Sequence, residues 1–454
     1  MTDVFSAADA ATPLDLVTAA TFPAWVERQS PAVRAFAAAS GFRGEAGKTL
    51  LAPGADGTIA RAAVGLGKEA FSFASAPNLL PAGDYALGDI PEGFDPSVLA
   101  IAWADGAYRF TRYKAADPVA RLKMPDGVDA EAVLREAAAI AWLRDLVNTP
   151  AADLGPSEIA AAAVRLAEAN GASVSVVEGA DLERDYPMVA AVGRAASDGP
   201  RMIELTWSKG EAGAPRLVLV GKGVAFDTGG LNLKTGAGMG LMKKDMGGSA
   251  HALALARLVM EAGLNVNLTL LVPTVENAIG AGAFRPGDVL TSRKGLTVEI
   301  DNTDAEGRLI LADALARGSE LDPDLMIDFA TLTGAARVAL GPELAPLYTD
   351  DDALAEDVLA AAKSVGDPVW RMPMWDPYVA GMKSSIADTK NTGDDAMGGS
   401  ITAALFLKKF VDAKSWAHLD VWAWRKAAYG RPAGAAANGF RAVWAMLQKR
   451  YPPA

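Results

Sequence analysis

Four acidic residues in the middle of the chain have the types and positions that a metal site needs: Asp227, Asp245, Asp304 and Glu306. Each lies at the end of a predicted strand or at the start of a predicted helix. Ligands of α/β proteins bind outside the carboxyl ends of the strands, so these side chains could converge. Four carboxylates at close range repel one another unless cations compensate them. Two divalent ions ~3.5–4 Å apart would supply that charge, and such a pair suits hydrolysis.

Three cationic residues accompany these acids. Lys222 lies five residues before the first acid. Nearby metal charge would lower its pKa, so that it could become a nitrogen ligand. Lys234 follows a pair of glycines and could remain protonated, to polarise a substrate carbonyl or stabilise an oxyanion. Arg308 lies two residues after the last acid, and its planar fork suits a small anion such as bicarbonate, or a carboxylate.

Each of these residues also has an ordinary structural interpretation. An aspartate after a strand is more often a helix cap or a turn residue, and Asp245 could simply cap its helix. Lys234 could be a solvated lysine, and Arg308 could form a structural ion pair. Residue types and spacing alone therefore leave both interpretations open, and carboxylate ligands do not choose between zinc, manganese and magnesium.

Alternating apolar runs and helical stretches must position these side chains. The runs that predict buried strands are Val174–Val177, Leu217–Val220, Val266–Val272, Leu296–Ile300 and Leu325–Phe329. The helical stretches between them include Gly248–Glu261 and Gly307–Glu320. This alternation predicts an α/β fold with a mostly parallel central sheet flanked by helices.

The length of 454 residues predicts more than one domain, because a single hydrophobic core stops growing at ~250–300 residues. We expect a smaller N-terminal α/β domain at 1–128, a connecting helix within 129–150 and a catalytic domain at 151–454. The connecting helix would begin at Asp129 as its N-cap, and a second helix would span Pro156–Asn170.

The composition limits the chemistry. The chain has no cysteine, which excludes a disulfide framework, a thiolate metal site and a cysteine nucleophile. Zinc hydrolases often use two or three histidines, whereas this chain has only His251 and His418, so a metal site must depend mainly on oxygen ligands. We expect both histidines to be structural. The formal net charge of -12 gives no electrostatic reason to bind nucleic acid or an anionic membrane.

Targeting signals are not evident. Residues 1–20 contain three aspartates and lack a basic start followed by an apolar run, so we expect no signal peptide. No stretch of ~20 uncharged apolar residues predicts a membrane-spanning helix. We therefore expect a cytoplasmic protein.

One segment resembles the signature octapeptide of the leucyl aminopeptidase family, which comprises two-metal, hexameric cytosol aminopeptidases. It is Asn302-Thr303-Asp304-Ala305-Glu306-Gly307-Arg308-Leu309. The upstream positions that match the family in type and spacing are Lys222, Asp227, Lys234 and Asp245. The resemblance continues through Thr331–Ala335, Gly398–Ala404 and Trp416–Asp420, and covers roughly residues 140 to 445. The N-terminal region resembles the family only in position and approximate size.

This resemblance implies a metal-dependent aminopeptidase that releases N-terminal amino acids from peptides. It implies two zinc or manganese ions in each subunit. The more exchangeable ion would be bound by Asp227, Asp304 and Glu306, and the other by Lys222, Asp227, Asp245 and Glu306. Asp227 and Glu306 would bridge the two ions. A bridging water would attack the peptide carbonyl, and the free α-amine of the substrate would bind one metal.

The remaining roles are implied in the same way. Lys234 would stabilise the oxyanion, and Arg308 would hold a bicarbonate that acts as general base, so that no catalytic histidine is needed. The residues implied to line the substrate site are Met242, Thr331, Leu332 and Gly334. The family is typically a homohexamer whose active sites face an inner cavity. The implied partners are peptides with a free N-terminus, and neither nucleic acid nor membrane.

The chain departs from the family pattern after Asp420, where many members have small residues near the side-chain pocket. Here the sequence is Val421-Trp422-Ala423-Trp424-Arg425. The indoles of Trp422 and Trp424 could narrow that pocket, which puts a leucine preference in doubt. Alternatively, both indoles pack in the core, and we favour this interpretation.

Other functions compete with this reading. A two-metal phosphoesterase would need cationic groups beyond Lys234 and Arg308, and none is evident in the sequence. Some relatives of the family also bind DNA, but the net charge of -12 and the lack of a basic run disfavour that role here. A catalytically inactive scaffold is disfavoured because all of the expected site residues are present.

Overall fold

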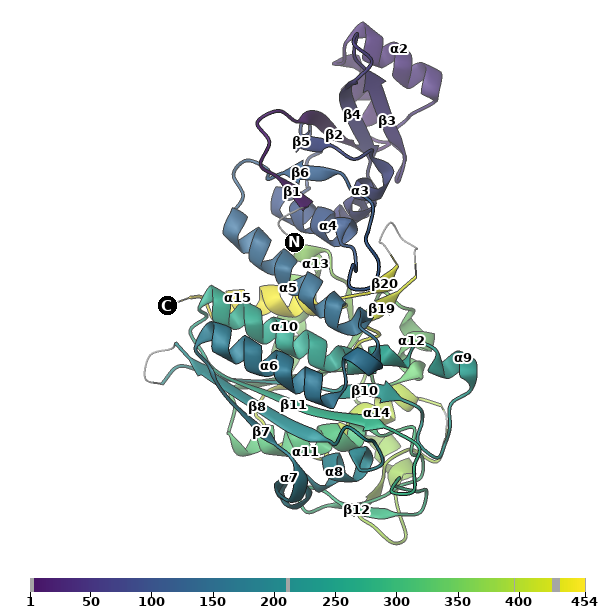
Figure 1. The fold of residues 1–454 in the computed structure, drawn as a ribbon, viewed down its shortest axis with the longest axis vertical. Helices are drawn as coiled ribbons and strands as arrows, with labels where there is room; N and C mark the ends of the chain where they lie inside the picture. Colours follow the sequence, from purple (N-terminus) through teal and green to yellow (C-terminus); the bar gives the residue numbers. More distant parts are fainter. Residues whose placement is uncertain (1–3, 210–212, 396, 427–432, 454) are drawn as a thin grey trace. The chain divides into compact units, whose positions relative to one another are not determined.

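The structure is a computed structural model that describes residues 4–209, 213–395, 397–426 and 433–453 (Figure 1). The contacts divide the described residues into two compact units. The N-terminal unit lies within Met1–Ala141 and Arg425–Gly434, and the C-terminal unit lies within Trp142–Trp424 and Ala435–Ala454. The domain boundaries that we expect near residues 128 and 150 stay predictions.

The N-terminal unit contains a six-stranded sheet of order β1-β6-β5-β2-β4-β3. β3 pairs with β4 antiparallel, and the other neighbours pair parallel. The strands are β1 (Phe5–Ser6), β2 (Thr12–Val17), β3 (Thr49–Pro53), β4 (Ile59–Gly65), β5 (Asp84–Leu87) and β6 (Arg121–Lys123). The helices are α1 (Phe22–Glu27), α2 (Pro31–Ser40), η2 (Ala70–Ser75), α3 (Ala76–Leu79) and α4 (Pro96–Ala107). The smaller α/β domain predicted at this end of the chain is therefore confirmed.

The C-terminal unit contains a nine-stranded sheet. Eight of its strands follow the order β16-β15-β18-β14-β9-β11-β8-β7, and β10 pairs with β11. Its central neighbours β18, β14, β9 and β11 run parallel, as predicted. The strands are β7 (Ser173–Val177), β8 (Arg201–Ser208), β9 (Arg216–Gly221), β10 (Gly223–Asp227), β11 (Asn267–Asn277), β14 (Leu325–Ala330), β15 (Ala345–Tyr348), β16 (Val369–Arg371) and β18 (Trp416–Asp420). Every residue of β14 is buried, which explains why the strand is apolar except for Asp328.

Helices cover both faces of this sheet (Figure 1). α6 and α10 pack on one face, and α8 and α11 pack on the other. The helices from α5 onward are α5 (Ala130–Asn148), η3 (Ala151–Asp153), α6 (Pro156–Asn170), α7 (Gly179–Asp185), α8 (Pro187–Gly193), α9 (Gly236–Met239), η4 (Met242–Met246), α10 (Gly247–Ala262), α11 (Gly307–Glu320), α12 (Gly334–Leu340), α13 (Asp352–Val365), η5 (Asp376–Met382), α14 (Gly399–Lys408) and α15 (Phe440–Arg450). No helix among the described residues has both the length and the apolarity needed to cross a membrane.

Three predictions about strands need correction. The run Val174–Val177 was predicted to be a buried strand, but it lies in the edge strand β7, whose residues are exposed or only partly buried. The run 296–300 was placed in the central sheet, but its strand β13 (Thr297–Glu299) belongs to a separate three-stranded sheet with β12 (Val289–Thr291) and β17 (Thr389–Lys390). Only the middle residue of β13 is buried, so this strand does not have the two-sided burial of a central strand.

The remaining two strands, β19 (Trp424–Arg425) and β20 (Gly434–Ala435), form a separate two-stranded sheet.

A further correction concerns β10, which was not among the predicted strands. The strand β11 is eleven residues long. Its first half pairs with β9, and its second half pairs with β10, from Gly223 opposite Thr274 to Asp227 opposite Asn277. Lys222 lies between the two strands, so β11 fixes the positions of both Lys222 and Asp227.

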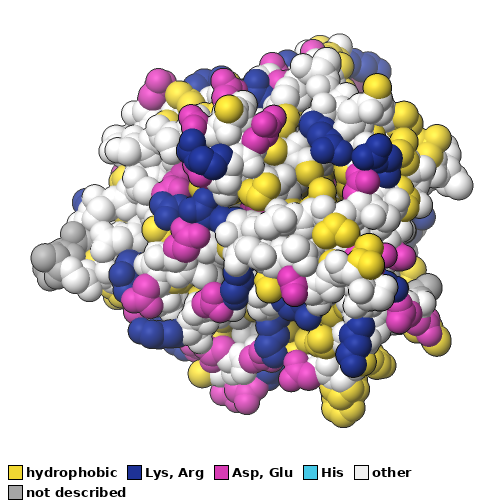
Figure 2. All heavy atoms as spheres, turned by 90° about the horizontal axis from the view of Figure 1, so that it is seen from below, with side chains coloured by type: hydrophobic (Ala, Val, Ile, Leu, Met, Phe, Trp, Pro, Cys, Tyr) yellow, Lys and Arg dark blue, Asp and Glu magenta, His cyan; other side chains and the backbone are white. Residues whose placement is uncertain are grey.

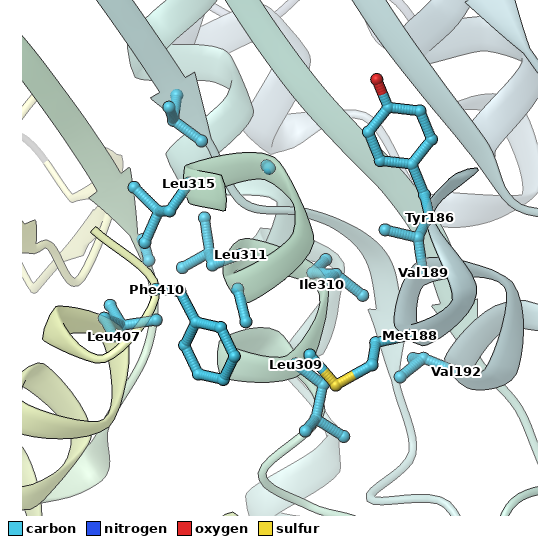
Figure 3. Close-up of a cluster of buried hydrophobic side chains, with 14 of the residues drawn as sticks. Tyr186, Met188, Val189, Val192, Leu309, Ile310, Leu311, Leu315, Leu407 and Phe410 are labelled. Carbon is cyan, nitrogen blue, oxygen red and sulfur yellow. The ribbon is translucent and has the colours of Figure 1, made fainter. Parts of the chain in front are cut away.

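A buried hydrophobic cluster holds α11 in place. Figure 3 shows Leu309, Ile310, Leu311 and Leu315 of this helix among side chains from two other segments. Those labelled neighbours are Tyr186, Met188, Val189, Val192, Leu407 and Phe410. Burial of one such aliphatic side chain contributes roughly 1.5–3 kcal/mol. The cluster therefore fixes the start of α11, which directly follows Glu306.

The surface seen in Figure 2 has charges of both signs. Lysine and arginine side chains alternate there with acidic ones, and hydrophobic side chains lie between them. A continuous basic stripe, which nucleic-acid binding proteins use to neutralise phosphates, is not present on this face.

Candidate active site

A cavity of about 490 Å³ lies in the C-terminal unit, where β9 and β10 end. The residues predicted to bind metal ions or an oxyanion all line it, and these are Lys222, Asp227, Lys234, Asp245, Asp304 and Glu306. The residues predicted to contact substrate line it as well, and these are Met242, Thr331, Leu332 and Gly334. The rule that parallel sheets bind ligands beyond the carboxyl ends of their strands therefore led to residues that line one cavity.

Three of the acids form a compact buried group. Carboxylate oxygens of Asp227, Asp245 and Glu306 lie within 4.8 Å of one another. These residues are only 3%, 3% and 1% exposed, respectively. Asp304 lies nearer to solvent, with 31% of its side chain exposed. The sequence thus predicted the members of the group correctly, although the chain separates them by up to 79 residues.

The ordinary interpretation, that Asp245 caps α10, is wrong. This helix begins after Met246, whose side chain makes no capping hydrogen bond. The Asp245 side chain instead accepts a 2.8 Å hydrogen bond from Thr331 Oγ1 and contacts Lys222. Its pKa is held below its ordinary value, because the attraction of Lys222 and Lys244 outweighs the opposing effect of burial.

Lys222 is the cation at the centre of the acidic group. Its Nζ lies 2.7 Å from Asp245 Oδ2 and 3.1 Å from Glu306 Oε1, and it donates to Thr331 O at 2.8 Å. Burial opposes its charge, but Asp245, Glu306 and Asp227 attract it more strongly and raise its pKa. Lys222 is therefore an ammonium group in this arrangement, and it would need competing cations nearby before it could act as a nitrogen ligand.

Gly307 makes room for Lys222. A Cβ atom at this position would lie 2.2 Å from Cε and 2.5 Å from Nζ of Lys222. Such contacts are far below van der Waals separation. The glycine in the octapeptide is therefore required by the close approach of a lysine side chain to the first turn of α11.

Lys234 neutralises the outer part of the group. Its Nζ lies 2.8 Å from Asp227 Oδ2 and also pairs closely with Asp304 Oδ1. Burial opposes its charge, but Asp227 and Asp304 outweigh this effect and raise its pKa. Lys234 therefore remains protonated and lines the cavity as a hydrogen-bond donor.

The arrangement of these acids suits bound cations, because charged carboxylates so close together repel one another. Burial, followed by repulsion from Asp227, raises the pKa of Glu306 to about 8. The same two causes raise the pKa of Asp304 to about 6. The Oε2 atom of Glu306 is buried and has no hydrogen-bond partner among the described residues. A carboxylate oxygen in this situation suits a divalent cation, which would supply the missing charge and the missing partner.

Asn277 is a site residue that the sequence reading missed. It is 1% exposed, and its Nδ2 donates to Asp227 Oδ1 at 2.8 Å and to Thr303 O at 3.1 Å. The Gly229 amide donates to the same oxygen of Asp227. Asn277 ends β11, so the rule applied to the other strand ends would have found it.

Arg308 lies differently from the expectation. It is buried, its NH1 donates to Asn391 O at 2.8 Å, and it is not among the residues that line the cavity. Its Nε has no hydrogen-bond partner among the described residues. Burial lowers the pKa of Arg308 to about 10 although Glu306 attracts its charge. The geometry thus supports a structural role at least as well as an anion-binding one.

Asp420 holds the loop that lines the cavity after β14. Its Oδ1 accepts hydrogen bonds from the amides of Leu332 and Thr333 at 2.9 and 3.1 Å. Its Oδ2 accepts one from Thr333 Oγ1 at 2.6 Å. This buried carboxylate therefore fixes the backbone that presents Thr331 and Gly334.

Trp422 lines the cavity and is half-buried, so it does not pack in the core as we favoured. The Nζ of Lys244 lies 4.0 Å from its ring centroid, and the Cζ of Arg337 lies 3.9 Å from it. Both cations line the cavity, and neither was predicted. Trp424 is not among the lining residues.

Both histidines are structural in this arrangement. His251 is fully buried, and its Nδ1 lies 2.6 Å from Gly247 O. His418 is fully buried and pairs with Asp328 at 2.6 Å. Neither is among the residues that line the cavity.

Comparison with known proteins identifies the family. The catalytic domain of the cytosol aminopeptidase family matches residues 141–444, and the M17 aminopeptidase N-terminal domain matches residues 12–125. A probable cytosol aminopeptidase from Synechococcus is 44% identical over 331 residues, which cover 70% of this chain and 66% of that relative.

Solved structures agree with this match. A cytosol aminopeptidase from Coxiella burnetii has a TM-score of 0.93 and 43% sequence identity, covering 98% of this chain and 99% of that chain. The bottromycin maturation enzyme BotP in complex with Mn has a TM-score of 0.85 and 34% identity, covering 97% of this chain and 100% of that chain. This chain therefore belongs to the cytosol aminopeptidase family, whose members are metal-dependent exopeptidases.

Proposed function

We propose that this protein releases N-terminal amino acids from peptides with the help of two divalent metal ions. One observation supports this most directly: three buried carboxylates have oxygens within 4.8 Å of one another, and one of those residues, Glu306, retains an unpartnered oxygen. Bound cations would supply the charge and the partner that this group lacks among the described residues.

The ligand assignment follows the expectation from the sequence. Asp227 and Glu306 would bridge the two ions, Asp304 would complete the more exposed site, and Lys222 with Asp245 would complete the buried one. Asp304 is the most exposed of the acids, which supports an exchangeable outer ion. The ions, when bound, would activate water and polarise the scissile carbonyl.

The chain's own residues would position substrate and balance charge. Lys234 is held as an ammonium at the cavity wall, where it would donate to the developing oxyanion. Asp420 would keep the lining loop in place, and Trp422 would bound the space for the substrate side chain. Arg308 would hold bicarbonate as general base, and the unpartnered Nε atom supports that role.

Further properties extend the same proposal. The Mn in the BotP complex supports manganese as one of the ions, with zinc as the other candidate. The names of the curated relatives support a cytosolic location. We also propose a homohexamer that acts on peptides with a free N-terminus.

The test is hydrolysis of a panel of amino-acid p-nitroanilides by metal-stripped protein after addition of Mn²⁺ or Zn²⁺. We expect metal-dependent cleavage of the free-amine substrates and none of their N-acetylated forms. Folded protein that cleaves no substrate with either metal would contradict the proposal.

Glu306→Gln tests the centre itself. We expect it to abolish hydrolysis and to remove the increase in melting temperature that metal gives the wild type. Glu320→Gln is the matched control, because Glu320 ends the same helix and pairs with Arg293 at the surface. It should behave as the wild type.

A further inference from the structure

The lysine and arginine side chains that line the cavity differ in how many carboxylates they contact. Lys222 and Lys234 each contact two of the site's carboxylates. Lys244 lies 3.7 Å from Asp245 Oδ1. Arg337, on α12, lines the same cavity, but its guanidinium forms no ion pair or hydrogen bond with any residue that the structure describes. The wall near Arg337 therefore has positive charge that the protein itself does not neutralise.

Trp422 holds the Arg337 guanidinium in place. The Cζ atom lies 3.9 Å from the ring centroid, well inside the range of a cation–π contact. A guanidinium that stacks on an aromatic ring keeps its N–H donors free in its plane. Those donors match the two oxygens of a carboxylate. Arg337 is exposed, so a ligand in the cavity can reach it.

Lys244 adds charge of the same sign. Its Nζ lies 4.0 Å from the centroid of the same indole, and the residue is only 2% exposed. A buried ammonium is poorly placed to contact substrate directly. Asp245 at 3.7 Å offsets part of its charge, and the remainder adds to the positive potential at this wall. A lysine or arginine side chain of a substrate would meet repulsion here.

We propose that Arg337, held against Trp422, binds a carboxylate of the peptide substrate, so that the enzyme favours acidic substrates over neutral ones of the same shape. The inference rests on the proposed aminopeptidase function. The carboxylate has two sources of the same chemistry: an acidic side chain near the N-terminus, or the free C-terminus of a short peptide.

Two matched substrate pairs distinguish these sources. The first pair is the α-p-nitroanilides of glutamic acid and glutamine, and the second is Leu-Gly and its C-terminal amide. The readout is the ratio of kcat/KM within each pair, which cancels any general loss of activity. We expect Arg337→Gln to lower one ratio about three- to ten-fold, as for a charge-assisted contact near the surface. The substrate pair whose kcat/KM ratio falls identifies which carboxylate Arg337 binds.

Two further variants sharpen the result. Arg337→Lys should keep part of the preference, because it keeps the charge but not the planar fork. Arg216→Gln is the control. Arg216 begins β9, at the opposite end of the strand from Lys222, and pairs with Asp322. Its replacement should leave both ratios at the wild-type value. Ratios that are equal in the wild type and Arg337→Gln, or that fall as much in Arg216→Gln, would overturn the inference.

A binding measurement makes the inference independent of turnover. Reduced-amide analogues of Glu-Gly and Gln-Gly, and of Leu-Gly and its C-terminal amide, resist hydrolysis, and their affinities can be measured by calorimetry. We expect the wild type to bind the carboxylate forms more tightly than the amide forms, and Arg337→Gln to lose that difference. Unequal binding without hydrolysis would reject the aminopeptidase proposal alone, whereas equal binding with normal hydrolysis would reject the role of Arg337 alone.

Discussion

The amide of Asn277 donates a 2.8 Å hydrogen bond to Oδ1 of Asp227, directly across the pairing of β11 with β10. Asn277 therefore fixes the orientation of an acid that we propose as a bridging metal ligand. Such supporting residues commonly change metal affinity by ~10–100-fold when they are replaced.

We predict that Asn277→Ala weakens metal binding by about 10–100-fold and lowers activity accordingly at limiting metal. Calorimetric titration of the metal-stripped protein with Mn²⁺ measures this. Thr274→Val is the control, because Thr274 lies on the same strand and its buried Oγ1 has no hydrogen-bond partner among the described residues. Unchanged affinity in Asn277→Ala would show that Asp227 does not depend on it.

Gly307→Ala should inactivate the enzyme for a steric reason. The new Cβ would overlap Lys222 Cε, at 2.2 Å, and displace Lys222 from Asp245 and Glu306. Alanine favours a helix over glycine by ~1 kcal/mol, so a general loss of helix stability is not expected. Activity and metal affinity should fall while the circular dichroism spectrum stays the same.

The matched control for this variant is Gly236→Ala at the start of α9. A Cβ atom there would meet nothing within 4 Å. This variant should keep wild-type activity. Normal activity in Gly307→Ala would mean that Lys222 need not occupy its observed position.

His251 should make the protein sensitive to acid. Burial lowers its pKa to about 4, so the folded form stays neutral while the unfolded chain, with a pKa of ~6.5, takes up a proton as the pH falls. Neutral His251 makes its full contribution to the free energy of unfolding above the pKa of the unfolded chain. That contribution is lost as the pH falls from the pKa of the unfolded chain toward the pKa of the folded protein. The loss is about 2 kcal/mol between pH 7.5 and 5.

Urea unfolding at the two pH values measures this loss. His251→Leu should show a smaller decrease in free energy of unfolding than the wild type, by about the same 2 kcal/mol. NMR titration of the wild type gives an independent check, because the His251 imidazole should still be neutral at pH 5. A His251 ring that titrates near its ordinary pKa would contradict the prediction.

Trp422→Ala should widen the range of accepted first residues. Trp422 lines the cavity, and its removal opens space beside Lys244 and Arg337. We predict a rise in kcat/KM for phenylalanine relative to alanine p-nitroanilide of several-fold. Trp424→Ala is the control, because Trp424 is not among the residues that line the cavity. An unchanged profile in Trp422→Ala would separate this indole from substrate selection.

The sequence predicted the acidic group because Asp227 ends a strand of the parallel sheet, and Asp245 and Glu306 lie just before α10 and α11, which pack on that sheet. That argument needs only the order of elements, so it succeeded for Asp227 and Glu306. It failed for Arg337 and Lys244, since the side-chain directions of a seven-residue helix and a 3-10 turn depend on tertiary packing. It also failed for β10, whose pairing depends on the unusual length of β11.

Because β11 pairs with both β9 and β10, it limits how the sequence between Lys222 and Asp227 can vary. β11 pairs with β10 at Gly223, Val224 and Asp227, with one register shift between the last two positions. Because β10 already holds one extra residue there, insertion or deletion of another residue between Lys222 and Asp227 would displace the aspartate from its position opposite Asn277. The segment 224–226 can thus exchange side chains of similar size but cannot change its length, and Gly223 cannot take a side chain, because a Cβ there would lie 2.7 Å from Pro273 O. Over evolutionary time, we expect only size-conserving substitutions in 224–226 and no gaps in 223–226.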